Sequence, residues 1–246
     1  MQGKPRSVVI GGGGGLGVAI CRALAENGMQ VVLADLDGAR AQEIAEALRA
    51  EELDVLAEQC DAASSADVGA LAGRLEAGGL VDAVVAMAGV VRNDLLVKVK
   101  DSDFDLTIAT HLKGTLNALR AFLPAMRKRG YGRFVTMSSI AARGSMGGAS
   151  YSAAKAGIEG LTRTAAIEMA KSGVTVNCVA PGLVNAGMFL TVPEDYQKTS
   201  LASVPMGRAA EPAEIADCVR FLASREASYV TGQTLNICGG LSIGPL

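Results

Sequence analysis

The chain has 246 residues, of which 50% are apolar and 20% are charged, and its formal net charge is −2. This length and apolar content suit one well-buried domain over residues 1–246, and the small net charge argues against nucleic acid or an acidic membrane as a partner. The first residues lead directly into an apolar run, which leaves no room for a signal peptide, and no apolar stretch is long enough to span a bilayer. We therefore expect a cytoplasmic protein.

Cysteine and histidine usage narrows the chemistry further. The five cysteines show no C-x-x-C spacing, and His111 is the only histidine. Reduced thiols in a cytosolic core are the expected state of such cysteines, and a metal site built on histidine is nearly excluded. We therefore expect no metal centre.

Short apolar, β-branched runs alternate along the chain with longer segments of helical period. We predict strands at residues 7–10, 31–34, 55–59, 83–87, 134–137, 174–179 and 234–237. We predict helices at residues 16–27, 39–50, 66–76, 103–129 (broken near Gly114), 151–171 and 212–224. This alternation, with strands that are apolar almost throughout, indicates an α/β fold: a doubly wound, Rossmann-like parallel sheet with helices on both faces.

An unbroken glycine run, Gly11 to Gly15, separates the first predicted strand from the first helix, and Gly17 follows it. Glycine lets backbone N–H groups approach a diphosphate, whose charge the amino terminus of the helix then stabilises. The alternative is a flexible turn, but the position between a strand and an amphipathic helix favours a dinucleotide-binding turn.

Two aspartates follow the next strands. Asp35 ends the second predicted strand, where a carboxylate can accept both hydroxyls of an adenosine ribose and would repel a 2′-phosphate, which favours NAD over NADP. No arginine or lysine follows Asp35 immediately, and none lies in the glycine turn. The alternative for Asp35 is a helix cap or a turn residue. Asp61, at the end of the third strand, is placed to meet the adenine edge.

Candidate catalytic residues follow the fifth predicted strand. Ser138 and Ser139 end that strand, and Tyr151 and Lys155 lie one turn apart on the next helix. A tyrosine hydroxyl can exchange a proton with an alcohol or a carbonyl, and we expect the nearby ammonium to favour the phenolate and so to lower its pKa. A serine hydroxyl can hydrogen-bond the substrate oxygen. By itself, the Tyr-x-x-x-Lys spacing also fits two solvated side chains.

The stretch at about residues 186–210 breaks the alternation, with Pro193, Pro205 and mixed polarity, and we interpret it as a substrate lid. Its apolar residues predict an apolar substrate. They are Met188, Phe189, Leu190 and Val192.

Together these features resemble the short-chain dehydrogenase/reductase family over essentially the whole chain. Residues 151–157 match the signature of that family very closely, and further matches in the right order are Ala88-Gly89, Pro181-Gly182, Pro205-Met206-Gly207-Arg208 and Thr231-Gly232-Gln233-Thr234. The resemblance implies an NAD-dependent oxidoreductase acting on CH–OH donors, with Tyr151 as the acid/base and Lys155 on the nicotinamide ribose. Strand register favours Ser139 as the serine of the site, and the usual distance to the tyrosine favours Ser138, so both stay candidates.

The resemblance also implies a set of positions that contact the cofactor, around the glycine turn and the ends of the following strands. These positions are Gly11, Gly14, Gly15, Leu16, Gly17, Asp35, Leu36, Asp61, Ala62, Ala88, Gly89, Tyr151, Lys155, Pro181, Gly182 and Val184.

Several positions depart from the family pattern. Ile10, Ala86-Met87, Ala186 and Cys238 stand where threonine, Asn-Asn, threonine and aspartate are usual. His111 replaces the asparagine that often completes a proton relay. An imidazole can also relay protons, and a packed histidine with no catalytic part is the equal alternative.

The sequence leaves the substrate open. A secondary alcohol/ketone pair is the leading interpretation. Residues 88–96 resemble the 3-oxoacyl thioester reductase branch, and the segment around His111 resembles 3-hydroxyacyl-CoA dehydrogenases, so a 3-oxoacyl-ACP or -CoA reductase is the first alternative. A non-catalytic NAD-sensing or scaffolding protein is the second. Members of the family are commonly tetramers, so the resemblance also implies a homotetramer.

Overall fold

The computed structural model describes residues 4–191 and 194–243. Within them, seven strands form one sheet in the order β3-β2-β1-β4-β5-β6-β7, and every neighbouring pair is parallel. The strands are β1 (Arg6–Ile10), β2 (Gln30–Asp35), β3 (Val55–Gln59), β4 (Ala83–Ala86), β5 (Gly132–Met137), β6 (Val174–Pro181) and β7 (Thr234–Ile237). The predicted doubly wound parallel sheet is confirmed.

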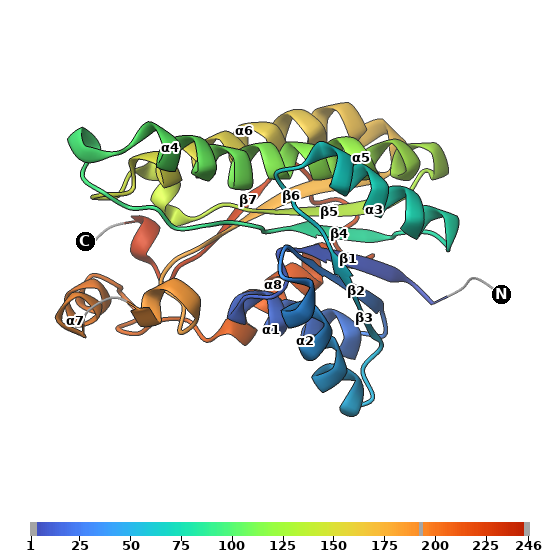
Figure 1. Cartoon of the computed structure of the whole chain (residues 1–246), viewed down its shortest axis with the longest axis horizontal. Helices are drawn as coiled ribbons and strands as arrows, with labels where there is room; N and C mark the ends of the chain where they lie inside the picture. The colour runs from blue at the N-terminus through green and yellow to red at the C-terminus, as the bar shows by residue number, and fades with distance from the viewer. Residues whose placement is uncertain (1–3, 192–193, 244–246) are drawn as a thin grey trace.

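Helices cover both faces of the sheet. They are α1 (Gly15–Glu26), α2 (Gly38–Ala50), α3 (Ser65–Ala77), α4 (Asp101–Thr107), α5 (Gly114–Arg129), α6 (Ala149–Met169), α7 (Glu194–Ala202) and α8 (Pro212–Leu222). α3, α5 and α6 lie on one face, and α1, α2 and α8 lie on the other (Figure 1). The strand order reverses between β1 and β4, so the crevice at the carboxyl ends of these strands is where a sheet of this kind binds ligands.

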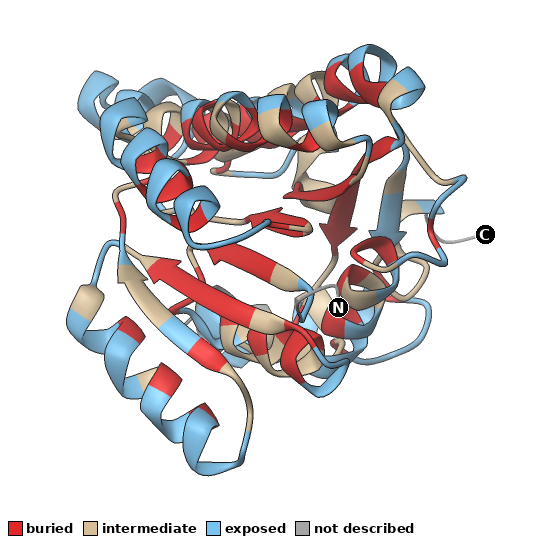
Figure 2. Cartoon of the chain, turned by 90° about the vertical axis from the view of Figure 1, so that its right-hand side faces the viewer, coloured by how far each residue is buried: buried red, intermediate tan, exposed pale blue. Residues whose placement is uncertain are grey.

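Alternate side chains of each strand enter two separate cores. Val8 and Ile10 pack in the cluster that includes Phe122 of α5, whereas Val9 packs in the cluster that includes Ile20 of α1. Because successive strand residues point to opposite faces, a strand buried on both sides must be apolar throughout. Figure 2 shows the result: the strands are largely buried, and the outer faces of the helices are exposed.

The segment before β5 departs from the expected break near Gly114. The chain stays helical there through a π-helical segment, η2 (Ile108–Lys113), that joins α4 to α5, and Gly114 itself has helical dihedrals, φ −58° and ψ −44°. A π segment carries one extra residue per turn and is frequent at functional sites. Here it carries His111, which is 4% exposed.

The segment interpreted as a lid leaves the sheet after β6 and returns to the place where it left. The Asn185 amide donates to the Ala210 carbonyl oxygen (2.8 Å), and the Ala210 amide donates to the Leu183 carbonyl oxygen (2.9 Å). Between these anchors lie the 3₁₀ segment η5 (Gly187–Thr191) and α7, a helix that the sequence analysis did not predict. Val192 and Pro193 lie outside the described residues.

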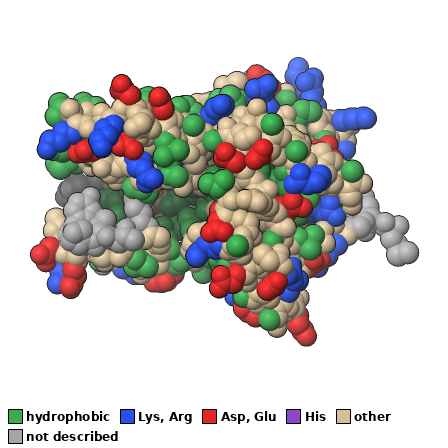
Figure 3. Space-filling view, in the orientation of Figure 1, with side chains coloured by type: hydrophobic (Ala, Val, Ile, Leu, Met, Phe, Trp, Pro, Cys, Tyr) green, Lys and Arg blue, Asp and Glu red, His purple; other side chains and the backbone are tan. Residues whose placement is uncertain are grey.

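The carboxyl ends of the strands open on a hollow. Figure 3 shows this hollow on the face seen in Figure 1, between the layer that contains α4 and the layer that contains α1, with hydrophobic side chains at its base. Among the described residues, no helix combines the length and apolar character that crossing a membrane requires.

Candidate active site

Tyr151 and Lys155 lie in the first turns of α6, beside the carboxyl end of β5. The Lys155 Nζ lies 5.3 Å from the centroid of the Tyr151 ring and donates a 2.7 Å hydrogen bond to the Met137 carbonyl oxygen. Lys155 is only 3% exposed, and burial lowers the pKa of its ammonium to about 8. At neutral pH the lysine therefore still carries most of its charge, held between the strand end and the phenol.

The Tyr151 hydroxyl is in contact with a serine from the strand end. Burial raises the pKa of Tyr151, and a hydrogen bond with the Ser139 side chain opposes that rise. From the sequence, the Lys155 ammonium was expected to lower the pKa of Tyr151. Instead the pKa of Tyr151 is raised, because the loss of water around the phenolate destabilises it more than its neighbours stabilise it. Tyr151 is thus a protonated phenol at neutral pH.

The two candidate serines point in different directions. Ser138 is 2% exposed, and its hydroxyl points towards α6. It donates to the Lys155 carbonyl oxygen (3.1 Å) and to Glu159 Oε1 (3.0 Å). The Ser139 Oγ accepts a hydrogen bond from the Ala141 amide (3.2 Å), and the Ser139 side chain lies close enough to the Tyr151 phenol to lower its pKa. Of the pair, Ser139 is therefore the one whose hydroxyl lies at the phenol.

His111 packs against the Tyr151 ring in an edge-on arrangement. Its Nε2 lies 3.0 Å from the Val90 amide nitrogen and 2.7 Å from the Val90 carbonyl oxygen, and its buried Nδ1 has no hydrogen-bond partner among the described residues. Burial, with the charge of Lys155, lowers the pKa of His111 to about 4. The imidazole is therefore neutral at physiological pH.

The glycine turn leaves space for a diphosphate. Gly11 has φ +86°, and a Cβ there would lie 2.4 Å from the Ala88 Cα, while a Cβ at Gly17 would lie 2.6 Å from the Gly12 carbonyl oxygen. A Cβ at Gly14, in contrast, would meet no atom of the described residues within 4 Å. Gly14 is also the N-cap of α1, with no side chain to bind the free amides and no acidic residue in the first turn. Open space in front of unpaired N–H groups at a helix amino terminus fits a phosphate group.

Asp35 is bound to the glycine turn. Its Oδ2 accepts a hydrogen bond from the Gly13 amide (2.8 Å), and its Oδ1 accepts one from the Asp37 amide (3.2 Å). A third group lies here that was not expected from the sequence: Arg40, whose Nε donates to the Gly13 carbonyl oxygen at 2.7 Å. Its place in the first turn of the helix after Asp35 was the available signal.

The remaining residues of the predicted adenine end lie after β3. Asp61 lies two residues beyond the end of that strand, and its Oδ1 accepts from the Ala63 amide (2.9 Å). The Ala62 carbonyl oxygen accepts from Asn117 Nδ2 (2.9 Å), a buried side chain of α5 that the sequence analysis did not single out. Leu36 is 65% exposed beside Asp35. Asn117 thus ties the loop after β3 to the helix that follows His111.

Two further predicted turns reach the same edge of the sheet. A Cβ at Gly89 would lie 2.1 Å from His111 Cε1, so the turn after β4 packs directly on the imidazole. At the end of β6, the Gly182 amide donates to the Ile237 carbonyl oxygen (2.9 Å), and Val184 forms a β-bridge to Ala210. Leu16 differs from this group, because its side chain packs against the core beside α1.

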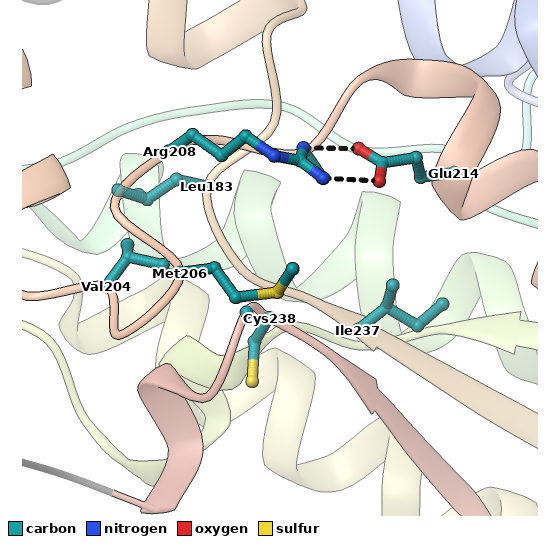
Figure 4. A pocket seen from close by; sticks show the side chains of 9 residues that line it. Leu183, Val204, Met206, Arg208, Glu214, Ile237 and Cys238 are labelled. Atoms are coloured by element: carbon teal, nitrogen blue, oxygen red, sulfur yellow. Dashed lines mark hydrogen bonds and ion pairs between the residues drawn. The ribbon is translucent and has the colours of Figure 1, made fainter.

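A small pocket lies where the segment 186–210 meets the ends of β6 and β7 (Figure 4). Leu183, Val204 and Met206 supply apolar walls, and Arg208 closes one side through a bidentate pair with Glu214 at 2.7 and 2.8 Å. Cys238 borders this pocket, and its Sγ accepts from the Ser242 amide at 3.4 Å. Its lining joins the residues at the ends of β6 and β7 to the stretch between α7 and α8.

The thiols carry no cross-link, as all five cysteines are free. Within the part of the chain that the structure describes, no group of three or more histidine, cysteine, aspartate or glutamate side chains is arranged to hold a metal ion.

Comparison with known proteins agrees with this architecture. A family model described as "Enoyl-(Acyl carrier protein) reductase" matches residues 11–242. The chain is 37% identical, over 96% of its length and 96% of the relative's, to (2S)-[(R)-hydroxy(phenyl)methyl]succinyl-CoA dehydrogenase subunit BbsD of Thauera aromatica. It is also 37% identical, over 96% of its length and 97% of the relative's, to the acetoacetyl-CoA reductase of Allochromatium vinosum.

Among solved structures, that of levodione reductase superposes with a TM-score of 0.92 and 29% identity, covering 99% of each chain. The shared fold and the shared sequence extend over nearly the whole length of these proteins and include both the glycine turn and the helix that carries Tyr151. The chain therefore belongs to the short-chain dehydrogenase/reductase family and is an oxidoreductase that acts on CH–OH groups.

Proposed function

We propose that this enzyme interconverts a secondary alcohol and a ketone with NAD(H), and that Tyr151 transfers the proton. The observation that carries the proposal is the contact of the Tyr151 hydroxyl with Ser139 beside the buried ammonium of Lys155. A proton donor, a hydroxyl that can orient a carbonyl oxygen and a fixed positive charge are the groups that ketone reduction needs.

The raised pKa of Tyr151 bears on the direction of the reaction. At neutral pH the phenol holds its proton, so it can donate that proton to the oxygen of a ketone. In the oxidative direction the same hydroxyl must first lose its proton, and the nearby Lys155 charge stabilises the resulting phenolate. A bound nicotinamide dinucleotide supplies the hydride donor or acceptor of the reaction.

The adenosine end of the site supports NAD. The Asp35 carboxylate lies beside the glycine turn, where it can accept the hydroxyls of a ribose and repel a 2′-phosphate. Gly14 and Gly15 would hold the diphosphate at the start of α1, and Gly11 and Gly17 would allow the close packing of the turn against Ala88 and Gly12.

His111 is proposed as a positioning residue for the Tyr151 ring. Its Nε2 is engaged by Val90, and no hydrogen bond joins its ring to Tyr151 or Lys155 within the described residues. These contacts favour packing over a proton relay, the other role that its sequence position suggests.

The substrate is proposed to be largely apolar, in keeping with the hydrophobic base of the hollow (Figure 3). An acyl thioester with a 3-oxo or 3-hydroxy group is the first alternative, because two relatives are named as CoA-thioester enzymes. The two ideas separate in one experiment. Initial rates at the NADH absorbance band would be compared for acetoacetyl-CoA and for simple cyclic ketones of similar size.

A faster rate with the thioester would favour the alternative, and a faster rate with the plain ketones would favour the leading proposal. An NAD-sensing protein without catalysis is the remaining possibility. NADH fluorescence that responds to protein, with no turnover of any ketone, thioester or secondary alcohol across a broad panel, would favour that role and contradict the enzyme.

A further inference from the structure

The peptide of Gly13 is held from both sides. Its amide donates to Asp35 Oδ2 at 2.8 Å, and its carbonyl oxygen accepts from Arg40 Nε at 2.7 Å. One carboxylate and one guanidinium therefore meet at the same glycine, at the point where the turn between β1 and α1 approaches the end of β2.

Arg40 is fixed at its backbone and open at its tip. Its amide donates to the Asp37 cap of α2 at 3.0 Å, which sets the side chain on the first turn of that helix. The residue is exposed, and within residues 4–191 and 194–243 its guanidinium forms no ion pair, although Asp35 and Asp37 lie in the same region. Within the same residues, the Nε bond to Gly13 is its only side-chain hydrogen bond.

The chemistry of that tip matches a phosphate. A guanidinium presents several donors in a planar fork that binds phosphate oxygens in pairs. An aspartate at the end of the second strand marks the 2′-hydroxyl of the adenosine ribose, and an arginine close to that position accommodates a 2′-phosphate instead. Arg40 and Asp35 contact the same glycine, so both can interact with the substituent at the 2′ position of the same ribose.

We propose that Arg40 is a second specificity-determining residue of the adenosine end, which gives this site measurable affinity for the 2′-phosphate of NADP. The proposal rests on the proposed function as a nicotinamide enzyme. Asp35 sets the preference for NAD, and Arg40 limits how strong that preference is. Cofactor choice here is then a balance between one carboxylate and one guanidinium, and not the property of Asp35 alone.

The test is a fluorescence titration of the protein with NADH and, separately, NADPH. Arg40→Gln is the informative variant, because its amide can still donate to the Gly13 carbonyl oxygen while the charge is gone. We expect the ratio of NADPH affinity to NADH affinity to fall about tenfold, a change of ~1.4 kcal/mol. Arg40→Lys, which keeps a positive charge, should retain part of the ratio.

A matched control is Arg49→Gln, at the far end of the same helix, where the guanidinium binds the Val55 carbonyl oxygen. It should leave the ratio as in the parent. Equal weakening of both dinucleotides by Arg40→Gln would mean that Arg40 only supports the glycine turn, and would overturn the proposal. An unchanged ratio would overturn it as well.

Asp35→Ala completes the cycle. We expect this variant to raise the ratio of NADPH affinity to NADH affinity. The double variant, Asp35→Ala with Arg40→Gln, should lose most of that increase. If the double variant keeps the gain, Arg40 does not hold the phosphate. If the parent protein binds neither dinucleotide, the proposed function itself fails, a result that differs from a measured but unchanged ratio.

Discussion

The imidazole of His111 stands edge-on to the phenol ring of Tyr151, with the ring centroids 5.3 Å apart and the planes at 87°. Aromatic pairs prefer this geometry to a face-to-face stack. Because the pKa of His111 is lowered to about 4, the ring facing the phenol carries no charge at neutral pH. The positive charge beside Tyr151 therefore comes from Lys155, and His111 limits where the phenol ring can lie.

Tyr151→Phe should remove the proton donor without disturbing the packing of the ring. Loss of a positioned general acid typically costs about 10²- to 10⁴-fold in rate, so we expect kcat to fall by that amount while NADH fluorescence still reports binding. Tyr131→Phe is the matched control. That ring stacks with Arg133 and Arg225 before β5 begins, at the opposite edge of the sheet. Retention of most of the activity by Tyr151→Phe would remove Tyr151 from its proposed role.

The two serines should respond differently to alanine. Ser139→Ala removes the hydroxyl at the Tyr151 phenol and should lower kcat/KM by about 10²-fold, as loss of one donor to a reacting oxygen does. Ser138→Ala removes contacts to the Lys155 carbonyl and to Glu159, and should cost ~1 kcal/mol of unfolding free energy. Steady-state kinetics and urea unfolding of both variants give the comparison. The reverse pattern would exchange their roles.

Protein stability should fall in mild acid because of His111. Its folded pKa of about 4 lies below its ordinary value of 6.5, so the unfolded chain binds this proton first as the pH drops. The stabilisation by the neutral ring is complete above pH 6.5 and is lost as the pH falls towards 4, a change of roughly 3 kcal/mol.

Urea unfolding of the parent and of His111→Asn between pH 7.5 and 4.5 measures this contribution. The asparagine variant has no such proton to bind, so its unfolding free energy should depend less on pH. Parallel pH curves for the two proteins would show that His111 does not titrate as described.

Gly89→Ala should displace His111, since the new Cβ would lie 2.1 Å from its Cε1. Overpacking of this kind typically costs about 1–3 kcal/mol, and we expect kcat to fall as well because the Tyr151 ring loses its neighbour. Gly69→Ala on the exposed side of α3 is the control, since a Cβ there meets no atom within 4 Å and alanine favours a helix.

Shortening the His111 side chain should relieve the clash with a Cβ at residue 89. In a His111→Ala background, Gly89→Ala should cost much less than it does alone, because residues in contact show coupled effects on stability. Additive costs in the double variant would mean that the loss arises elsewhere.

Much of the fold could be predicted from local pattern. Residues 7–10 and 83–87 were expected as strands, and the buried strands β1 (Arg6–Ile10) and β4 (Ala83–Ala86) lie there. Parallel strands buried on both faces must be apolar throughout, and the helices between them need one apolar stripe, so both leave a strong periodic signal. The π segment around His111 and the helix α7 left no such signal. Their conformations depend on contacts with distant parts of the chain, such as the hydrogen bonds between His111 and Val90.

The sequence by itself determined that Tyr151 and Lys155 share one helical turn, and that a glycine run and Asp35 follow neighbouring strands, because spacing along a helix or a parallel strand translates directly into position. Only the tertiary structure decided which serine meets the phenol, that the phenol pKa rises, and that Arg40 binds Gly13 opposite Asp35. Each of these depends on where side chains point and how deeply they are buried when segments far apart in the chain pack together. The spacing of residues along the sequence does not give either property.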